Sequence, residues 1–369
     1  MNNNLLPELE NNKIIEKVMK HYDLGFCKKE SYKELIDFIS LNWSENHIFT
    51  KSKVLFDWQH YDKTMDRYNF IIARNKDTKE IDSILGFVPT TQFDESIKKY
   101  DIWPCIWKTK DNIKKEGLGI GVALYKFLID NINVRSILII GISEMALRIY
   151  KKWNFNHGKI NQYYMINKEK TEFNLLGNFD DRYMNALDKV SDQTDKQLII
   201  CNENDFKNIE DSFFNGCKNN IPQKLKKYYF NRFFEHPIYK YNVYKILKYN
   251  VLQSLLFTRE VKKDKSIALR IVDFCGDIES ISCMHNQFQS LMVEFNYEYI
   301  DFLNAGIDEK HFNNAGFIKK KINGEIIIPN YYEPFLLENI DLDYAWKTID
   351  NSEPIFFKAD ADQDRPNVL

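Results

Sequence analysis

The sequence predicts an α/β protein with mixed sheets, built from two domains of the same kind. Three observations lead to this expectation: strand-like and helix-like segments alternate along the whole chain, a glycine-rich turn stands between a strand and a helix, and the second half repeats a pattern of the first. With 369 residues, the chain has room for about two domains of roughly 100–200 residues each.

The first half contains a regular series of predicted elements. We expect an amphipathic helix over 32–41, strands over 68–73 and 81–88, a strand over 101–108, a helix over 121–131, a buried strand over 136–142, a short helix over 144–153 and a strand over 161–167. The strand DIWPCIWK at 101–108 carries Pro104, which cannot donate to a sheet ladder. This strand is therefore expected to be bulged, splayed or at an edge.

A repeat sets the expected domain limits. The stretch YKKWNF at 150–155 aligns with FNNAGF at 312–317, at an offset of 162 residues (312 − 150), and the same offset places the strand 136–142 on 298–304. A polar stretch with few strand or helix signals separates the two series. We expect a first domain over 1–170, a connection over 171–195 and a second domain over 196–369.

Charge and cysteine content exclude several classes of partner. The chain has 51 Lys and Arg against 53 Asp and Glu, so no basic face for nucleic acid is indicated. No secretory signal or apolar run of membrane-span length is recognisable, which predicts a cytoplasmic protein. None of the six cysteines forms a CxxC pair, and Cys283 with His285 does not make a zinc site, so no metal is expected.

The turn KEGLGIGVALYKF at 115–127 is the clearest chemical signal. It places Gly117, Gly119 and Gly121 at alternate positions before a helix, an arrangement that lets backbone N–H groups approach an anion such as a phosphate. It lacks the Lys-Ser/Thr pair of a P-loop, and Val122 and Leu124 stand where a dinucleotide fingerprint needs glycine. The alternative is an ordinary strand–helix turn in which glycine only provides tightness.

Two motifs resemble those of the GNAT-type N-acyltransferases. EGLGIGVAL at 116–124 resembles their acyl-CoA pyrophosphate loop, Q/R-x-x-G-x-G/A, and SEMALRIYKKWNF at 143–155 resembles their second motif. Ala146, Tyr150 and Phe155 match that motif, whereas Ser143 and Asn154 replace its Asn and Gly. The resemblance implies tandem GNAT-like domains.

The second domain is expected to be degenerate. Where its glycine loop should fall, DFCGDIE at 273–279 has one glycine and three acids, which would repel a pyrophosphate. Phe312 stands at the position of Tyr150 and has no hydroxyl. We therefore expect the second half to keep the fold without binding coenzyme A, and to help form the acceptor site.

The resemblance implies a set of site residues for a coenzyme A ester as co-substrate. Tyr150 would donate to the leaving thiolate, and Cys105 lies in the irregular strand whose backbone N–H would polarise the thioester carbonyl. Glu116 falls where Gln or Arg is expected, and the neighbouring lysines would offset it. The expected cofactor-binding residues are Lys114, Lys115, Gly117, Leu118, Gly119, Ile120, Gly121, Val122 and Ser143.

The whole chain, including KADADQDRPN at 358–367, resembles the tandem-domain sugar N-acyltransferases of bacterial surface polysaccharides such as O-antigen and lipopolysaccharide. This implies transfer of an acetyl or 3-hydroxybutanoyl group to the amine of a dTDP-linked amino-dideoxy sugar, a nucleotide sugar as partner. A homodimer is left open. The expected acceptor-binding residues are His47, Trp58, His60, Asp62, Asp360 and Arg365.

Two other functions remain open at this point. A tRNA-dependent aminoacyltransferase of the cell wall would share a tandem fold, but it would favour a basic surface and would not need Gly119 and Gly121. A non-catalytic protein that binds a coenzyme A ester or a partner would tolerate Glu116 and Ser143.

Overall fold

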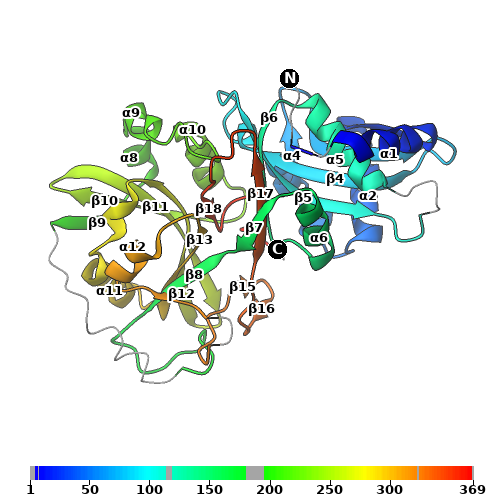
Figure 1. Ribbon diagram of the computed structural model, residues 1–369. Helices are drawn as coiled ribbons and strands as arrows, with labels where there is room; N and C mark the ends of the chain where they lie inside the picture. Colours follow the sequence, from blue (N-terminus) through cyan, green and yellow to red (C-terminus); the bar gives the residue numbers. More distant parts are fainter. Residues whose placement is uncertain (1–4, 7, 114–118, 180–194, 322–323, 368–369) are drawn as a thin grey trace.

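The computed structural model describes residues 5–6, 8–113, 119–179, 195–321 and 324–367. Two mixed sheets lie side by side, each flanked by helices (Figure 1). The first sheet has the order β1 (Tyr22–Lys28), β3 (Arg67–Asn75), β4 (Ile81–Pro89), β5 (Tyr100–Thr109), β6 (Val134–Ile140), β17 (Asp343–Thr348) and β7 (Asn156–Lys159), with β2 (Tyr61–Asp62) paired to β3. The predicted α/β class with mixed sheets is thereby confirmed.

The second sheet repeats this plan. Its order is β9 (Lys196–Ile200), β10 (Asn242–Lys248), β11 (Val251–Lys263), β12 (Ser266–Gly276), β13 (Tyr299–Ala305), β8 (Asn161–Ile166) and β14 (Ile318–Lys319), with β18 (Phe356–Phe357) paired to β13. Each half has a parallel pair, β5 with β6 and β12 with β13, joined through a helix. A hairpin of β15 (Tyr331–Tyr332) and β16 (Phe335–Leu336) lies outside both sheets.

The two halves exchange strands. In Figure 1, β17 comes from the C-terminal part of the chain but lies between β6 and β7 in the first sheet. Conversely, β8 comes from the first half but pairs with β13 and β14 in the second sheet. Sheet membership therefore crosses the limits expected from the sequence: residues 161–166 fall within 1–170 and residues 343–348 within 196–369.

The helices cover the two sheets in a matching way. In the first half α1 (Glu8–His21), α5 (Ile120–Asn131) and α6 (Glu144–Lys152) share one core cluster, and α2 (Tyr32–Asn42), α3 (Ile48–Lys51) and α4 (Lys53–His60) share another. In the second half α11 (His285–Glu294) and α12 (Glu309–Asn314) pack in one cluster, and α8 (Glu203–Lys207), α9 (Asp211–Asn215) and α10 (Lys226–Tyr229) in another. The expected helices at 32–41, 121–131 and 144–153 are confirmed within about two residues at each end.

The repeat seen in the sequence is also a repeat of structure. After α6 the Phe155 N–H donates to the carbonyl of Tyr150 at 3.1 Å, and after α12 the Phe317 N–H donates to the carbonyl of Phe312 at 2.9 Å. The residue before each phenylalanine has a positive φ, 57° at Asn154 and 82° at Gly316. Asparagine tolerates this left-handed conformation better than most residues, so Asn154 can stand where the related motif has glycine.

A shared core and a buried ion pair join the halves. Residues of both sheets form one apolar cluster, with Trp103, Leu138 and Ile140 packed against residues such as Leu303 and Phe356. Beside it Arg135 donates through Nε to Asp101 at 2.7 Å, and the Gln223 N–H donates to the same carboxylate at 2.7 Å.

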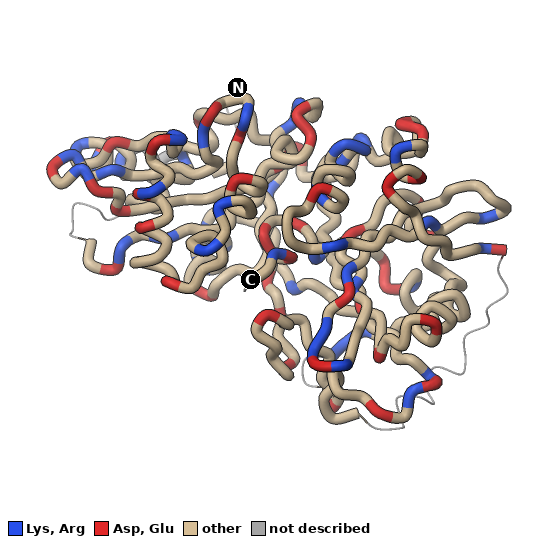
Figure 2. Tube along the Cα trace, turned by 180° about the vertical axis from the view of Figure 1, so that it is seen from behind, with Lys and Arg blue, Asp and Glu red and all other residues tan. Residues whose placement is uncertain are grey.

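Basic residues (Lys and Arg) and acidic residues (Asp and Glu) are interspersed along the Cα trace of both halves in Figure 2. No helix in the described parts of the chain is long and apolar enough to span a membrane.

Candidate active site

Strand β5 is irregular at the place where the sequence predicts it. Leu85 pairs with Trp107 and Phe87 with Pro104, so Cys105 and Ile106 together lie opposite Gly86. This is a β-bulge, which redirects backbone groups away from the regular ladder. On its other side β5 pairs with β6 only from Tyr100 to Ile102, so the two parallel strands separate just before Pro104. The strand is therefore both bulged and splayed.

The glycine turn leads directly into α5. Gly119 is the N-cap residue with a φ of 90°, a left-handed conformation that favours glycine, and no side chain caps the helix. The first N–H groups of this 12-residue helix are therefore not capped by a side chain, which suits an oxyanion. Four of the expected cofactor-binding residues, Lys114, Lys115, Gly117 and Leu118, lie outside the described residues.

Protein side chains also pack closely against the glycines. A Cβ atom on Gly119 would lie 2.6 Å from Cγ2 of Ile14, and one on Gly121 would lie 2.7 Å from Nε1 of Trp107. Both glycines are thus required by packing with α1 and β5, whatever else they do. Ile120 is buried beneath the turn, and Val122 is partly exposed.

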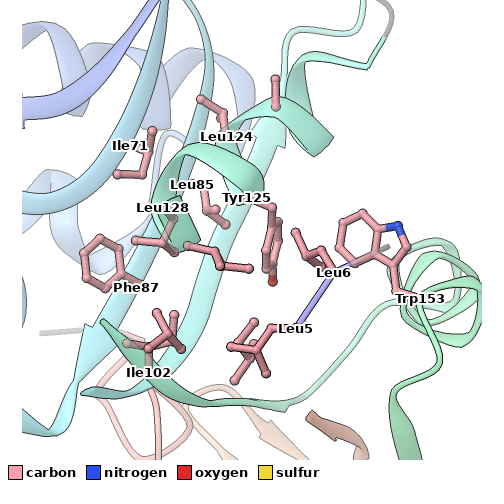
Figure 3. Packing of buried hydrophobic residues seen from close by; sticks show 14 of the residues in the cluster. Leu5, Leu6, Ile71, Leu85, Phe87, Ile102, Leu124, Tyr125, Leu128 and Trp153 are labelled. Atoms are coloured by element: carbon pink, nitrogen blue, oxygen red, sulfur yellow. The ribbon is translucent and has the colours of Figure 1, made fainter. Parts of the chain in front are cut away.

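Two leucines near the N-terminus enter the space between α5 and α6. Leu5 and Leu6 are 1% and 6% exposed and belong to the same core cluster as both helices. Figure 3 shows Leu6 between the rings of Tyr125 and Trp153 and Leu5 below Leu6, and Ile102 belongs to the same core cluster. Ile102 is the last residue of β5 that pairs with β6. The leucines therefore fill the space between α5 and α6, and this leucine-filled space is the groove of the candidate site.

Tyr150 lies on the α6 side of this groove. Its hydroxyl shares a hydrogen bond with that of Tyr125, and its ring packs against Trp107, Trp153 and Phe155. Burial raises the pKa of the Tyr150 hydroxyl, so it stays protonated at neutral pH and can act as a donor. Ser143 is the N-cap residue of α6, and its Oγ accepts the Ala146 N–H at 3.3 Å.

The thiol of Cys105 is not activated. Burial, together with the negative charge of Asp362, raises its pKa well above the ordinary value. Any part that Cys105 takes in catalysis would therefore come from the backbone of the bulge and not from a thiolate.

The expected acceptor residues do not form a single cluster. His47 and Arg365 lie together, with His47 Nε2 3.2 Å from Arg365 Nη2, and burial followed by the charge of Arg365 lowers the pKa of His47 to about 4. Trp58 and Asp62 line a cavity of about 640 Å³. The Asp62 carboxylate also accepts the Thr64 N–H at 2.9 Å.

His60 and Asp360 are fully buried. His60 contacts the carbonyl of Phe87 at 3.3 Å and Gln59 at 3.1 Å, and burial lowers its pKa to about 3. Asp360 forms an ion pair with Lys224 at 2.6 Å and accepts the Phe357 N–H at 2.8 Å. Neither side chain reaches the surface.

The C-terminal segment is part of the region between the two sheets. Gln363 donates to the carbonyl of Ile140, at the end of β6, at 3.2 Å, and a Cβ atom on Gly141 would lie 2.8 Å from the Gln363 amide. Asp364 pairs with Arg259 of β11 at 2.7 Å. The polar composition of this segment suggested that it takes part in the acceptor site. Its individual contacts could not be predicted from the sequence, because they depend on the fold.

The corresponding turn of the second half is built differently. The Asp277 carboxylate of this turn accepts a hydrogen bond from the nearby Glu279 N–H at 3.0 Å. At the equivalent of Tyr150, Phe312 stacks on Tyr163 of the exchanged strand β8 at 4.0 Å. Next to the turn lies a cavity of about 470 Å³ that includes Asp277 and Asp308. Within the described residues, no group of three or more His, Cys, Asp or Glu is placed to hold a metal ion.

The sequence-based comparisons find no relatives, whereas the structural comparison finds neighbours. No protein-family model matches the chain, and no curated protein matches it in sequence. A protein from Enterococcus faecalis described as a probable N-acyltransferase superposes with a TM-score of 0.52 at 11% identity, covering 89% of this chain and 73% of that one. A GCN5-related N-acetyltransferase from Anabaena variabilis superposes with a TM-score of 0.51 at 9% identity, with the same coverage. At such identities the likeness shows the fold alone: this chain shares the fold of these two proteins over most of its length.

Proposed function

We propose that the protein is an acyl-CoA-dependent N-acyltransferase. The observation that carries the proposal is the bulge of β5 at Cys105 and Ile106, where β5 and β6 separate, together with the uncapped first turn of α5, whose Gly121 packs against Trp107 of the same strand. The N-terminus of α5 would bind the pyrophosphate of coenzyme A, and the β5 bulge would receive the thioester.

The reaction would proceed by direct attack. The neutral amine of the acceptor adds to the thioester carbonyl, and the oxyanion of the tetrahedral intermediate accepts a hydrogen bond from the backbone of the β5 bulge. The carbon–sulfur bond then breaks, and the amine loses a proton to solvent. The Tyr150 hydroxyl, kept protonated by burial, would donate to the departing sulfur. We assign no general base.

Access to the groove would require a rearrangement. Leu5 and Leu6 occupy the space between α5 and α6, and Trp107 covers Gly121. An acyl-pantetheine arm that enters beside β5 would have to displace the leucines, so they oppose binding of the thioester as well as its turnover.

The finer proposal concerns the acceptor. We infer a dTDP-linked amino-dideoxy sugar as the amine and an acetyl or 3-hydroxybutanoyl group as the acyl group. The support for this is the resemblance of the whole chain to tandem sugar N-acyltransferases, together with the near balance of 51 Lys and Arg against 53 Asp and Glu, which disfavours a tRNA substrate.

Thiol release is the decisive assay. The protein is incubated with acetyl-CoA or 3-hydroxybutanoyl-CoA, with and without a panel of dTDP-amino sugars and simple amines. Sugar-dependent release would establish both substrates, and release with other amines only would keep the N-acyltransferase but reject the sugar. Binding of the thioester by calorimetry without any release would favour the binding protein.

A further inference from the structure

A buried arginine lies between the two halves without a carboxylate partner. Arg232 is 1% exposed and sits on the short π-helical turn Phe230–Phe234. Its Nη2 donates to the carbonyl of Ala359 at 2.9 Å, but Nε and Nη1 have no hydrogen-bond partner. Among the described residues, no carboxylate lies within 4.0 Å of its nitrogens. A buried charge without a counter-ion lowers stability.

The other deeply buried arginines of the second half are paired. Arg270 contacts Asp301 at 2.6 Å and Arg259 contacts Asp364 at 2.7 Å. Asp364 also accepts the Tyr241 hydroxyl at 2.8 Å, so this carboxylate is already used. The isolation of Arg232 is thus a local feature and not the general state of arginines in this fold.

A second unpartnered donor lies four residues further along. His236 Nδ1 accepts the N–H groups of Ile238 and Tyr239 at 3.1 and 2.8 Å. Burial, and then the charge of Arg232, lower the pKa of His236 to about 3, so the ring is neutral at pH 7. Its single proton must therefore be on Nε2, and Nε2 is buried without a partner.

Both donors flank the same indole ring. The Trp58 ring lies 4.4 Å from the His236 ring and 4.9 Å from Arg232 Cζ, and Phe93 lies 5.2 Å from the same carbon. Trp58 and Phe93 also line the cavity of about 640 Å³, so the guanidinium lies one side-chain layer behind the cavity wall. The indole is held by one long hydrogen bond, from Nε1 to the carbonyl of Asn231 at 3.4 Å. The Trp58 ring thus separates the donors from the cavity, and a ligand in the cavity would reach them only if the ring moved.

We propose that Trp58, Arg232 and His236 form a gated site for an oxyanion, a phosphate or a carboxylate, at the junction of the two halves. Its unpartnered groups are three N–H-bearing nitrogens, and an oxyanion can accept from all of them. The cavity wall carries four acidic residues and two basic ones: Asp57, Asp62, Glu95 and Glu235, and Lys63 and Lys227. Recognition of an oxyanion therefore comes from the three unpartnered nitrogens and not from the net charge of the wall. If the proposed N-acyltransferase function holds, the oxyanion is the acidic group of the acyl acceptor; this assignment rests on that function.

The stability of the free protein gives the first test. Arg232→Met replaces an unpaired buried charge by an apolar chain of similar length, so Tm is expected to stay the same or rise. Arg270→Met is the matched control, since it removes an arginine that is fully paired, and Tm should fall. A clear fall of Tm for Arg232→Met as well would mean that Arg232 is structural, and would overturn the proposal.

Ligand binding gives the second test and needs no variant for its first step. Tm of the wild-type protein is measured against sodium pyrophosphate and sodium acetate at constant ionic strength. One of them should raise Tm, pyrophosphate indicating a phosphate and acetate a carboxylate; no response to either would overturn the proposal. Arg232→Gln should weaken binding about 10- to 100-fold, the range expected for lost hydrogen bonds to a charged group.

The glycine turn is a second place where pyrophosphate could bind, so the two sites must be separated. Val122→Glu places a carboxylate at the start of α5 and should leave the response of the oxyanion site intact. If Val122→Glu abolishes the response and Arg232→Gln does not, the oxyanion site is rejected while the N-acyltransferase proposal stands. Thiol release remains an independent assay, so failure of that function leaves this binding result interpretable.

Discussion

At the scale of single residues, the glycine turn shows how packing and chemistry overlap. Gly119→Glu is not a clean test of anion binding. The Cβ atom of the new glutamate would collide with Ile14, and the φ of 90° at this position disfavours any side chain. Loss of binding in that variant would not separate a damaged fold from a blocked site. A position on the first helical turn that already carries a side chain is needed.

Val122 meets that need. It is the third helical residue of α5 and is partly exposed, and a glutamate there interacts favourably with the helix dipole. We expect Val122→Glu to keep the fold and to weaken acyl-CoA binding about 10- to 100-fold by repulsion, measured by calorimetry. Val122→Gln is the control of equal size without the charge. Equal affinities of the two variants would place the pyrophosphate elsewhere.

The paired hydroxyls of Tyr150 and Tyr125 allow the leaving-group donor to be identified. Tyr150→Phe should lower kcat roughly ten- to a thousandfold with little change in acyl-CoA affinity, because it removes one proton donor. Tyr125→Phe removes the partner hydroxyl and leaves Tyr150 in place, so kcat should fall much less. Equal losses in both variants would mean that the pair has a structural and not a chemical function.

At the scale of elements, much of the first half could be predicted because its signals are local. The proline in β5 predicted an irregular strand, and the bulge at Cys105 follows from the same backbone restriction. The glycine turn predicted where α5 begins, and the repeated pattern at 150–155 predicted where α6 ends. Other features depend on contacts far apart in sequence: Leu5 and Leu6 stand in a polar segment, MNNNLLPELE, with no sign of a core position. Arg232 is likewise a single arginine in an aromatic stretch, YYFNRFFEH.

The N-terminal leucines can be tested as occupants of the acyl-CoA groove. Removing a buried leucine side chain costs about 2–5 kcal/mol, so Leu5→Ala with Leu6→Ala should lower Tm of the free protein. If the leucines must leave when acyl-CoA binds, the same variant should bind acyl-CoA more tightly, because less contact is lost on binding. The two effects have opposite signs, and calorimetry and thermal unfolding measure them separately. Weaker binding by the variant would instead make the leucines part of the wall that contacts the ligand.

At the scale of the whole molecule, the strand exchange means that each sheet contains a strand from the other half of the sequence. The sequence repeat predicted two related halves, but it could not show that β8 and β17 change places, because a strand's partner is set by tertiary pairing and not by its own residues. The exchange holds together the junction of the two halves, where the proposed oxyanion site lies. Relative movement of the halves is therefore restrained by strand pairing in both sheets.

This architecture predicts how fragments behave. A fragment of residues 1–170 lacks β17, so β6 and β7 lose the strand that joins them, and it carries β8 without a partner. Unpaired strand edges promote association, so we expect this fragment to aggregate or remain unfolded by circular dichroism and size-exclusion chromatography. Two fragments cut inside 180–194 should reassemble when expressed together, because each supplies the strand that the other lacks.

A redesigned first half gives the control that makes the prediction sharp. Lys159 of β7 lies opposite Asp343 of β17 in the antiparallel pair, so a short glycine turn can join residue 159 directly to a copy of 343–348. This variant omits β8 and restores the order β6, β17, β7 within one fragment. It should be soluble and unfold cooperatively, whereas the 1–170 fragment should not. If 1–170 alone proved to be a folded monomer, the exchanged strands would be an accessory to two independent domains, and the junction could open to admit substrates without breaking either sheet.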